Sequence, residues 1–164
     1  MTTTASAATS TTASTTDRIE RSVVIGAPRE RIWRALTNPE EFGRWFGVDL
    51  KGQVFASGQR ARGRITHPGY EHVWFDIVVE ELRPQELMAW RWHPYAVDAA
   101  VDYDAEEPTR VTFTLQDAPG HGTRLTVVES GFDKVPPQRR LEAFRMNSNG
   151  WDAQVRNIVR HVGG

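Results

Sequence analysis

A long amphipathic segment closes this chain and constrains its fold more than any other feature. Seven apolar residues recur there at helical spacing and would share one stripe of a helix: Leu141, Phe144, Trp151, Val155, Ile158, Val159 and Val162. The preceding region, from Val54 to Gly131, reads as consecutive strands. A helix that follows an antiparallel sheet buries its apolar stripe against the concave face of that sheet. The sequence therefore predicts a curved sheet around a long helix, with a pocket between them.

Composition excludes several classes of function. The 164 residues carry a formal net charge of -1, so a global attraction to nucleic acid or to an anionic membrane is not expected. The absence of cysteine excludes disulfides, thiolate metal sites and cysteine nucleophiles. No apolar run approaches the ~20 residues that a membrane helix requires. We expect a cytoplasmic protein without stable membrane insertion.

The N-terminal segment, residues 1–16, consists almost entirely of Thr, Ser and Ala. Such a segment cannot bury enough apolar surface to offset the entropy of ordering, so we predict a disordered tail. It also lacks the basic and apolar regions of a secretory signal. Residues 17–164 are then expected to form one domain.

Turn signals divide the rest of the chain into elements. Ile19–Ile25 is predicted as a strand, followed by two short helices that open at Pro28 and Pro39, the second ending at Gly47. Later strands are expected at 48–55, 59–66, 71–82, 86–93, 109–116 and 123–130, before the final helix. The predicted fold is α+β, with an antiparallel sheet of six or seven strands.

Several segments resemble one family. They are RSVVIGAPRERIWRALTNPEEFGRWFG (21–47), VEELRP (79–84) with LMAWRW (87–92), GTRLTVVESGF (122–132) and NGW (149–151). Over about residues 17–162 the chain is similar to the domain named for the activator of heat-shock protein 90 ATPase homologue 1. That family belongs to the START-related helix-grip superfamily, with polyketide cyclase-like and pollen-allergen-like relatives, and includes small stand-alone bacterial domains. The resemblance implies a sheet gripping a C-terminal helix and a cavity for a small apolar or amphipathic molecule.

The candidate ligand site combines aromatic residues with a few polar ones. Six Trp in one chain of this length indicate that several line one apolar space, although Trp74 faces the opposite side of its strand. Glu129 falls among core positions, where a carboxylate is costly unless it is hydrogen-bonded or near a polar ligand. The alternative is a wet strand end or an arginine partner. The candidates are Trp45, Phe75, Met88, Trp90, Trp92, Phe113, Glu129, Phe144, Asn147, Ser148 and Trp151.

Three other clusters favour ordinary structural roles. The histidines at 67, 72, 93 and 121 lie in predicted turns without metal-ligand spacing, so exposed turn histidines, no metal and no cofactor are expected. The acidic connection at 93–108, with its carboxylates between 98 and 107, is interpreted as solvated, or as a lid over the cavity mouth. Cation binding is the alternative, although the segment lacks the glycine and ligand spacing of an EF-hand loop. Arg60, Arg62 and Arg64 share one strand face, interpreted as solvent-facing, with phosphate or RNA contact as the alternative.

The leading functional hypothesis is binding of a small hydrophobic or aromatic molecule, such as a lipid or a polyketide. The family name suggests an alternative, a chaperone- or partner-binding domain linked to the stress response, which would expose an apolar patch. A cofactor-free cyclase or hydrolase that uses Glu129 in the same cavity is a further alternative. No nucleophile elbow or phosphate loop occurs, so no catalytic residue is predicted and binding is favoured over catalysis.

Overall fold

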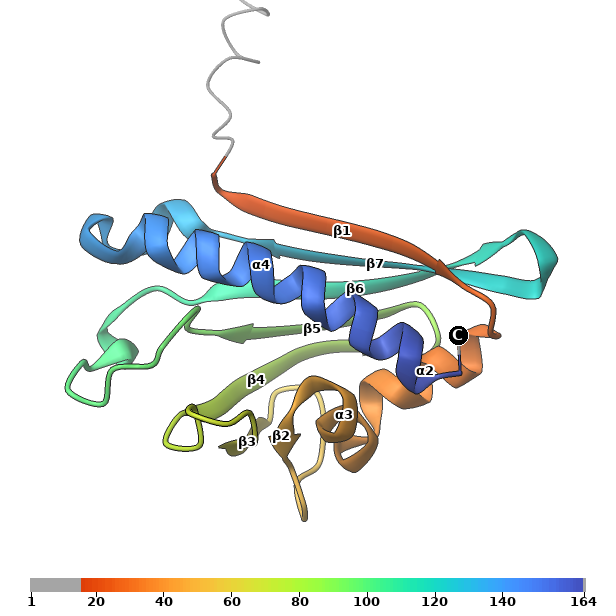
Figure 1. Cartoon of the computed structure of the whole chain (residues 1–164), viewed down its shortest axis with the longest axis horizontal. Coiled ribbons are helices and arrows are strands. Elements are labelled where there is room, and N and C mark those ends of the chain that lie inside the picture. The colour runs from red at the N-terminus through yellow and green to blue at the C-terminus, as the bar shows by residue number, and fades with distance from the viewer. Residues whose placement is uncertain (1–15, 164) are drawn as a thin grey trace, which may run out of the picture.

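The computed structural model describes residues 16–163, and within them an antiparallel sheet of seven strands curves around a long C-terminal helix (Figure 1). Apart from residue 16, the expected disordered tail lies outside the described residues. The strands are β1 (Arg18–Ile25), β2 (Val48–Asp49), β3 (Arg60–Ile65), β4 (Trp74–Arg83), β5 (Leu87–Trp92), β6 (Thr109–Ala118) and β7 (Gly122–Ser130). Their order across the sheet is β1-β7-β6-β5-β4-β3-β2, so the first and last strands of the chain are neighbours.

Within residues 16–163, three α-helices accompany the sheet: α2 (Arg29–Thr37), α3 (Pro39–Phe46) and α4 (Pro137–His161). The side chain of Asn38 caps α3 by accepting from the backbone N–H of Glu41 at 3.0 Å. Gly47 ends α3 in the left-handed conformation, with φ of 94°. The predicted fold class, with two short helices after the first strand and a long helix at the end, is confirmed.

The second strand is much shorter than expected. A strand was predicted over 48–55, but β2 ends at Asp49 because the chain turns at Gly52, whose φ is 78°. The backbone at Asp49 then crosses close to β3, where a Cβ on Gly63 would lie 1.9 Å from the Asp49 carbonyl oxygen. Similarly β4 begins at Trp74 rather than at 71, because the preceding residues form a turn.

The core lies between the concave face of the sheet and α4. Ile77, Met88 and Trp90 are completely buried on the strands, and Trp151 and Ile158 are buried on α4. Figure 1 shows α4 running across this face. No helix among residues 16–163 is long and apolar enough to span a bilayer.

One member of the predicted apolar stripe does not join the core. Leu141 is 65% exposed, whereas Ala143, two residues later, is buried. Leu141, Ser148 and Val155 are spaced by seven residues and therefore share one edge of α4. Near the start of the helix this edge remains open to solvent, so the prediction that Leu141 faces the sheet is wrong.

The outer face of the sheet carries the arginine stripe, as predicted. Arg60 makes two hydrogen bonds to Asp76, at 2.7 and 2.5 Å. The guanidinium carbons of Arg62 and Arg64 each lie 4.0 Å from the centroid of the Trp74 ring. Trp74 therefore points outward, opposite to the buried Phe75.

Candidate ligand-binding site

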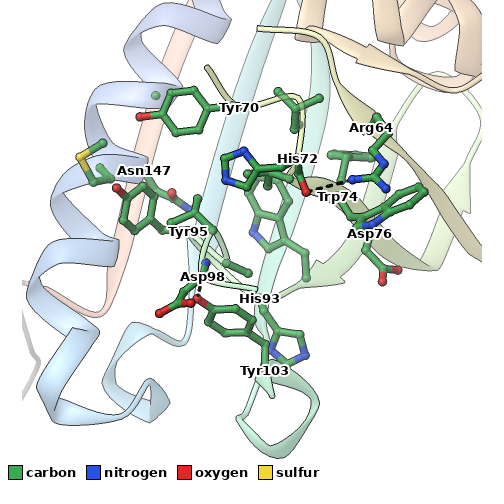
Figure 2. A pocket seen from close by; sticks show the side chains of 18 of the residues that line it. Arg64, Tyr70, His72, Trp74, Asp76, His93, Tyr95, Asp98, Tyr103 and Asn147 are labelled. Carbon is green, nitrogen blue, oxygen red and sulfur yellow. Dashed lines mark hydrogen bonds between the residues drawn. The ribbon is translucent and has the colours of Figure 1, made fainter. Parts of the chain in front are cut away.

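An open cavity of about 940 Å³ lies beside the middle of α4. Its walls come from the ends of β3, β4 and β5, from the turn before β4, from the 93–104 connection, and from residues 146–154 of α4. Figure 2 shows the cavity between Tyr70, Tyr95 and Asn147 on one side and Trp74 on the other. Its volume falls within the roughly 300–1,000 Å³ typical of small-molecule sites.

Aromatic side chains form much of the lining: Phe46, Tyr70, Trp74, Phe75, Trp92, Tyr95, Tyr103 and Trp151. The rings of Trp92 and Trp151 lie 6.0 Å apart between centroids. Three of the large apolar side chains that are exposed in the described part of the chain also belong to this lining, namely Tyr70 (37%), Trp74 (40%) and Val101 (39%). The others, Val24, Val54, Val78 and Leu141, lie outside this lining, so exposed apolar surface is only partly concentrated at the cavity.

A buried carboxylate holds one wall of the cavity in place. Glu129 on β7 is 0% exposed, and four side chains donate hydrogen bonds to it. Oε2 accepts from the indole Nε1 of Trp92 at 2.7 Å and from the hydroxyl of Thr109 at 2.6 Å. Oε1 accepts from Nε1 of Trp151 at 2.8 Å and from Nδ2 of Asn147 at 2.9 Å. The alternative of a wet or arginine-paired Glu129 is therefore wrong.

Burial raises the pKa of Glu129, because desolvation disfavours the charged form, while the four hydrogen bonds oppose this effect. Three of the four donors, Trp92, Asn147 and Trp151, line the cavity, although Glu129 itself does not. Both indole N–H groups are engaged by the carboxylate, so these residues offer the cavity mainly the apolar parts of their rings. Glu129 thus acts as a positioning residue behind the wall.

The sequence-predicted site residues do not all lie at the cavity. Four of them line the cavity: Phe75, Trp92, Asn147 and Trp151. Met88, Trp90 and Phe113 lie in the core, each at most 2% exposed.

The remaining candidates make structural contacts elsewhere. Trp45 donates its indole N–H to the Ala35 carbonyl at 2.8 Å. The ring of Phe144 lies 5.2 Å from that of Phe132, centroid to centroid. The hydroxyl of Ser148 accepts from Arg21 at 2.8 Å.

Sequence reasoning missed the tyrosines of the cavity. Tyr70 lies in the turn before β4, and Tyr95 and Tyr103 lie in the acidic connection. These segments have no helical or strand periodicity. The one sequence feature that could have indicated them as site residues is the presence of aromatic side chains in otherwise polar loops. Tyr95 also has a left-handed backbone, with φ of 49°, which is uncommon for a bulky residue and typical of functional segments.

The acidic connection is fixed to α4 by one arginine. Arg139 donates to Glu106 at 2.8 Å and to the carbonyl of Pro94 at 2.8 Å, and its guanidinium lies 4.8 Å from the Tyr103 ring centroid. The connection lines the cavity mouth, and its role as a lid stays a prediction. His93 is half-buried rather than exposed, with 21% side-chain exposure. Among the described residues, no three His, Cys, Asp or Glu side chains gather as metal ligands would.

Solved structures of other proteins share this arrangement of sheet and helix. MLL2253 from Mesorhizobium loti is 26% identical, with a TM-score of 0.67 over 88% of this chain and 95% of its own. NE0264 from Nitrosomonas europaea is 18% identical, with a TM-score of 0.68 over 92% and 96%. DynU16, a protein in the dynemicin biosynthetic locus, is 23% identical, with a TM-score of 0.64 over 88% of this chain and 46% of DynU16.

Among curated proteins, none matches the sequence. The family profile described as Activator of Hsp90 ATPase homolog 1-like protein matches residues 26–163. This match extends from the end of β1 to the end of α4 and includes every segment that lines the cavity. The chain therefore belongs to the Activator of Hsp90 ATPase homolog 1-like family.

Proposed function

We propose that this protein binds a small hydrophobic or aromatic molecule in the cavity beside α4. The observation that carries the proposal is an aromatic-lined cavity of about 940 Å³, one wall of which is held by the buried carboxylate of Glu129. Small-molecule sites are usually concave, largely preformed and lined by apolar and aromatic side chains together with placed polar groups. Here charged side chains, among them Arg60, Arg64 and Asp98, line the cavity beside the aromatic ones. Because Trp92 and Trp151 are already fixed, a ligand would lose little free energy in ordering this wall.

Apolar contact is sufficient to account for measurable affinity. Burying about 300 Å² of ligand surface at about 25 cal/mol/Å² contributes on the order of 7 kcal/mol before the costs of association. Dissociation constants roughly in the micromolar to millimolar range would follow. Direct titration at NMR concentrations covers that range.

The proposal is tested by titrating the full ¹⁵N-labelled chain with three probes: the flavonoid naringenin, palmitate and 2-naphthol. We expect at least one probe to shift the indole N–H resonances of Trp92 and Trp151 in a saturable manner. The Trp45 indole is an internal control, because it is bonded to Ala35 and lies outside the cavity lining. Absence of saturable shifts at both cavity indoles with all three probes would contradict the proposal.

A blocking variant makes this test specific for the cavity. Gly150 lines the cavity from α4, and a Cβ added there would meet nothing within 4 Å. Gly150→Phe should therefore fill the space without disturbing the backbone, and should abolish the probe-induced shifts. Gly150→Ala, the matched control, should keep them. Undiminished binding by a folded Gly150→Phe protein would place the ligand elsewhere.

A further inference from the structure

Hydrogen bonds to Glu129 fix the orientation of its neighbour Asn147. The side-chain nitrogen Nδ2 of Asn147 lies 2.9 and 3.2 Å from the two carboxylate oxygens. Both oxygens of Glu129 accept from N–H or O–H groups, so the amide presents its N–H₂ group to Glu129 and turns Oδ1 to the other side. In the part of the chain that the structure describes, no side chain or backbone group donates to this Oδ1.

The unpaired oxygen belongs to a residue of the cavity wall. Asn147 lines the cavity and lies on its α4 side in Figure 2. Two other polar atoms of this wall, the indole nitrogens of Trp92 and Trp151, are both engaged by Glu129. The three residues together therefore present two apolar ring systems and one carbonyl oxygen with unused acceptor capacity.

We infer that the ligand is an aromatic or similar apolar molecule with a hydroxyl or N–H donor, and that Oδ1 of Asn147 accepts a hydrogen bond from that donor. This inference rests on the proposed function and narrows its ligand class. The amide cannot turn around to serve a ligand with only an acceptor, because its oxygen would then face the carboxylate of Glu129. The oxygen of an ether or ketone at the same place would face Oδ1 of Asn147, and two acceptors cannot hydrogen-bond to each other. Asn147 is thus a specificity-determining residue for ligands with a donor.

A matched pair of probes isolates the donor. 2-Naphthol and 2-methoxynaphthalene share the same ring system, but the methyl ether lacks the hydroxyl proton. We measure Kd for both at neutral pH from the indole shifts of Trp92 and Trp151 in the full chain. One added neutral hydrogen bond predicts tighter binding of 2-naphthol, by about fivefold to tenfold.

Two variants separate this contact from a general loosening of the wall. Asn147→Leu keeps the approximate volume but removes Oδ1, so the affinity ratio between the two probes should fall to about one. Thr109→Val also removes a donor from Glu129, but Thr109 is completely buried and does not line the cavity. Thr109→Val should therefore preserve the preference for 2-naphthol even if both affinities change.

Each outcome is decisive for the inference. Equal Kd values in the wild-type protein, which needs no variant to fold, would overturn it while leaving the proposed function intact. A preference for 2-naphthol that persists in Asn147→Leu would also overturn it. Failure of both probes, naringenin and palmitate to bind would remove the proposed function, and the inference with it.

Discussion

The indole nitrogen of Trp151 lies 2.8 Å from Oε1 of Glu129, and this hydrogen bond joins α4 to β7 beside the cavity. Trp92 reaches the other carboxylate oxygen from β5. One buried acid therefore fixes two rings that come from different elements of the fold. Because indole nitrogen donates and cannot accept, the arrangement requires an acceptor at this position.

Glu129→Gln should destabilise the protein by about 1–3 kcal/mol at neutral pH. The amide has the shape of the acid but replaces one acceptor oxygen with an N–H₂ group. That group would face either Trp92 and Thr109 or Trp151 and Asn147, and would leave a buried indole N–H without a partner. Urea unfolding of both proteins at pH 7 measures the loss. The isosteric change Glu107→Gln, at an exposed position, should have little effect.

The environment of Glu129 is tested by the pH dependence of the free energy of unfolding, measured for wild type and for Glu129→Gln. Burial raises its folded-state pKa above the ordinary 4.5, so the folded protein holds this proton more tightly than the unfolded chain. The stability that the acid contributes is complete below pH 4.5 and is lost as pH rises from there through the raised pKa. The free energy of unfolding of wild type minus Glu129→Gln should therefore fall above pH 4.5. A difference that rises with pH would mean that the four donors outweigh desolvation.

The fold was predictable because its signals are local. Alternation in 59–66 placed Ala61 and Gly63 inside and the arginines outside, and both small residues are buried. Pro39 and Gly47 marked the ends of α3 to within one residue. Local patterns did not reveal which turns of α4 the sheet covers. Leu141, near the start of the helix, was therefore wrongly predicted to be buried.

The site was only partly predictable because it is assembled over long distances in sequence. The strand pattern placed Glu129 among core residues, but its donors lie 18 to 37 positions away on other elements. The Trp content predicted an aromatic space, yet periodicity could not tell Trp90, which is sealed in the core, from Trp92, which reaches the cavity. Tyr70, Tyr95 and Tyr103 lie in loops without helical or strand periodicity. Their position at the cavity depends on the three-dimensional course of these loops, which local sequence patterns do not predict.

Trp92→Phe should destabilise the protein more than the same change at Trp74. Phenylalanine keeps an aromatic ring at position 92 but leaves Oε2 of Glu129 one donor short. We expect a loss of about 1–3 kcal/mol, measured by urea unfolding at pH 7. Trp74 is 40% exposed and packs between Arg62 and Arg64, so its replacement should cost less than about 1 kcal/mol. Equal losses would show that the hydrogen bond to Glu129 contributes nothing measurable.

Two helical glycines should respond in opposite ways to a single methyl group. Gly150 on α4 has open space around an added Cβ, so Gly150→Ala should raise the free energy of unfolding by about 0.5–1 kcal/mol through helix propensity. In α3 an added Cβ on Gly43 would lie 2.2 Å from the carbonyl oxygen of Val48. Gly43→Ala should therefore cost about 1–3 kcal/mol through overpacking. Thermal unfolding ranks the two variants, and a stabilising Gly43→Ala would contradict the close contact between α3 and β2.

A second buried carboxylate, Glu41, links α3 to the end of α4. It is 8% exposed, and it bonds to Arg31, to Nε of Arg34 at 3.2 Å and to Nε2 of His161 at 3.0 Å. Burial alone would raise its pKa, but the hydrogen bonds from Arg31 and His161 and the charges of Arg31 and Arg34 outweigh burial and lower the pKa. The contribution of Glu41 to stability therefore grows as pH rises, whereas that of Glu129 falls.

Glu41→Gln should consequently lose stability at neutral pH and much less in acid. A lowered folded-state pKa contributes stability that is complete above the ordinary value of 4.5 and is lost as pH falls through the folded pKa. We expect a deficit of about 1–3 kcal/mol at pH 7 that narrows below pH 4.5, measured by urea unfolding across this range. Glu40→Gln, an exposed neighbour on the same helix, is the matched control and should show neither effect. A deficit that stays constant down to pH 3 would contradict the ion-pair cluster, because only an ionised Glu41 attracts the two arginines.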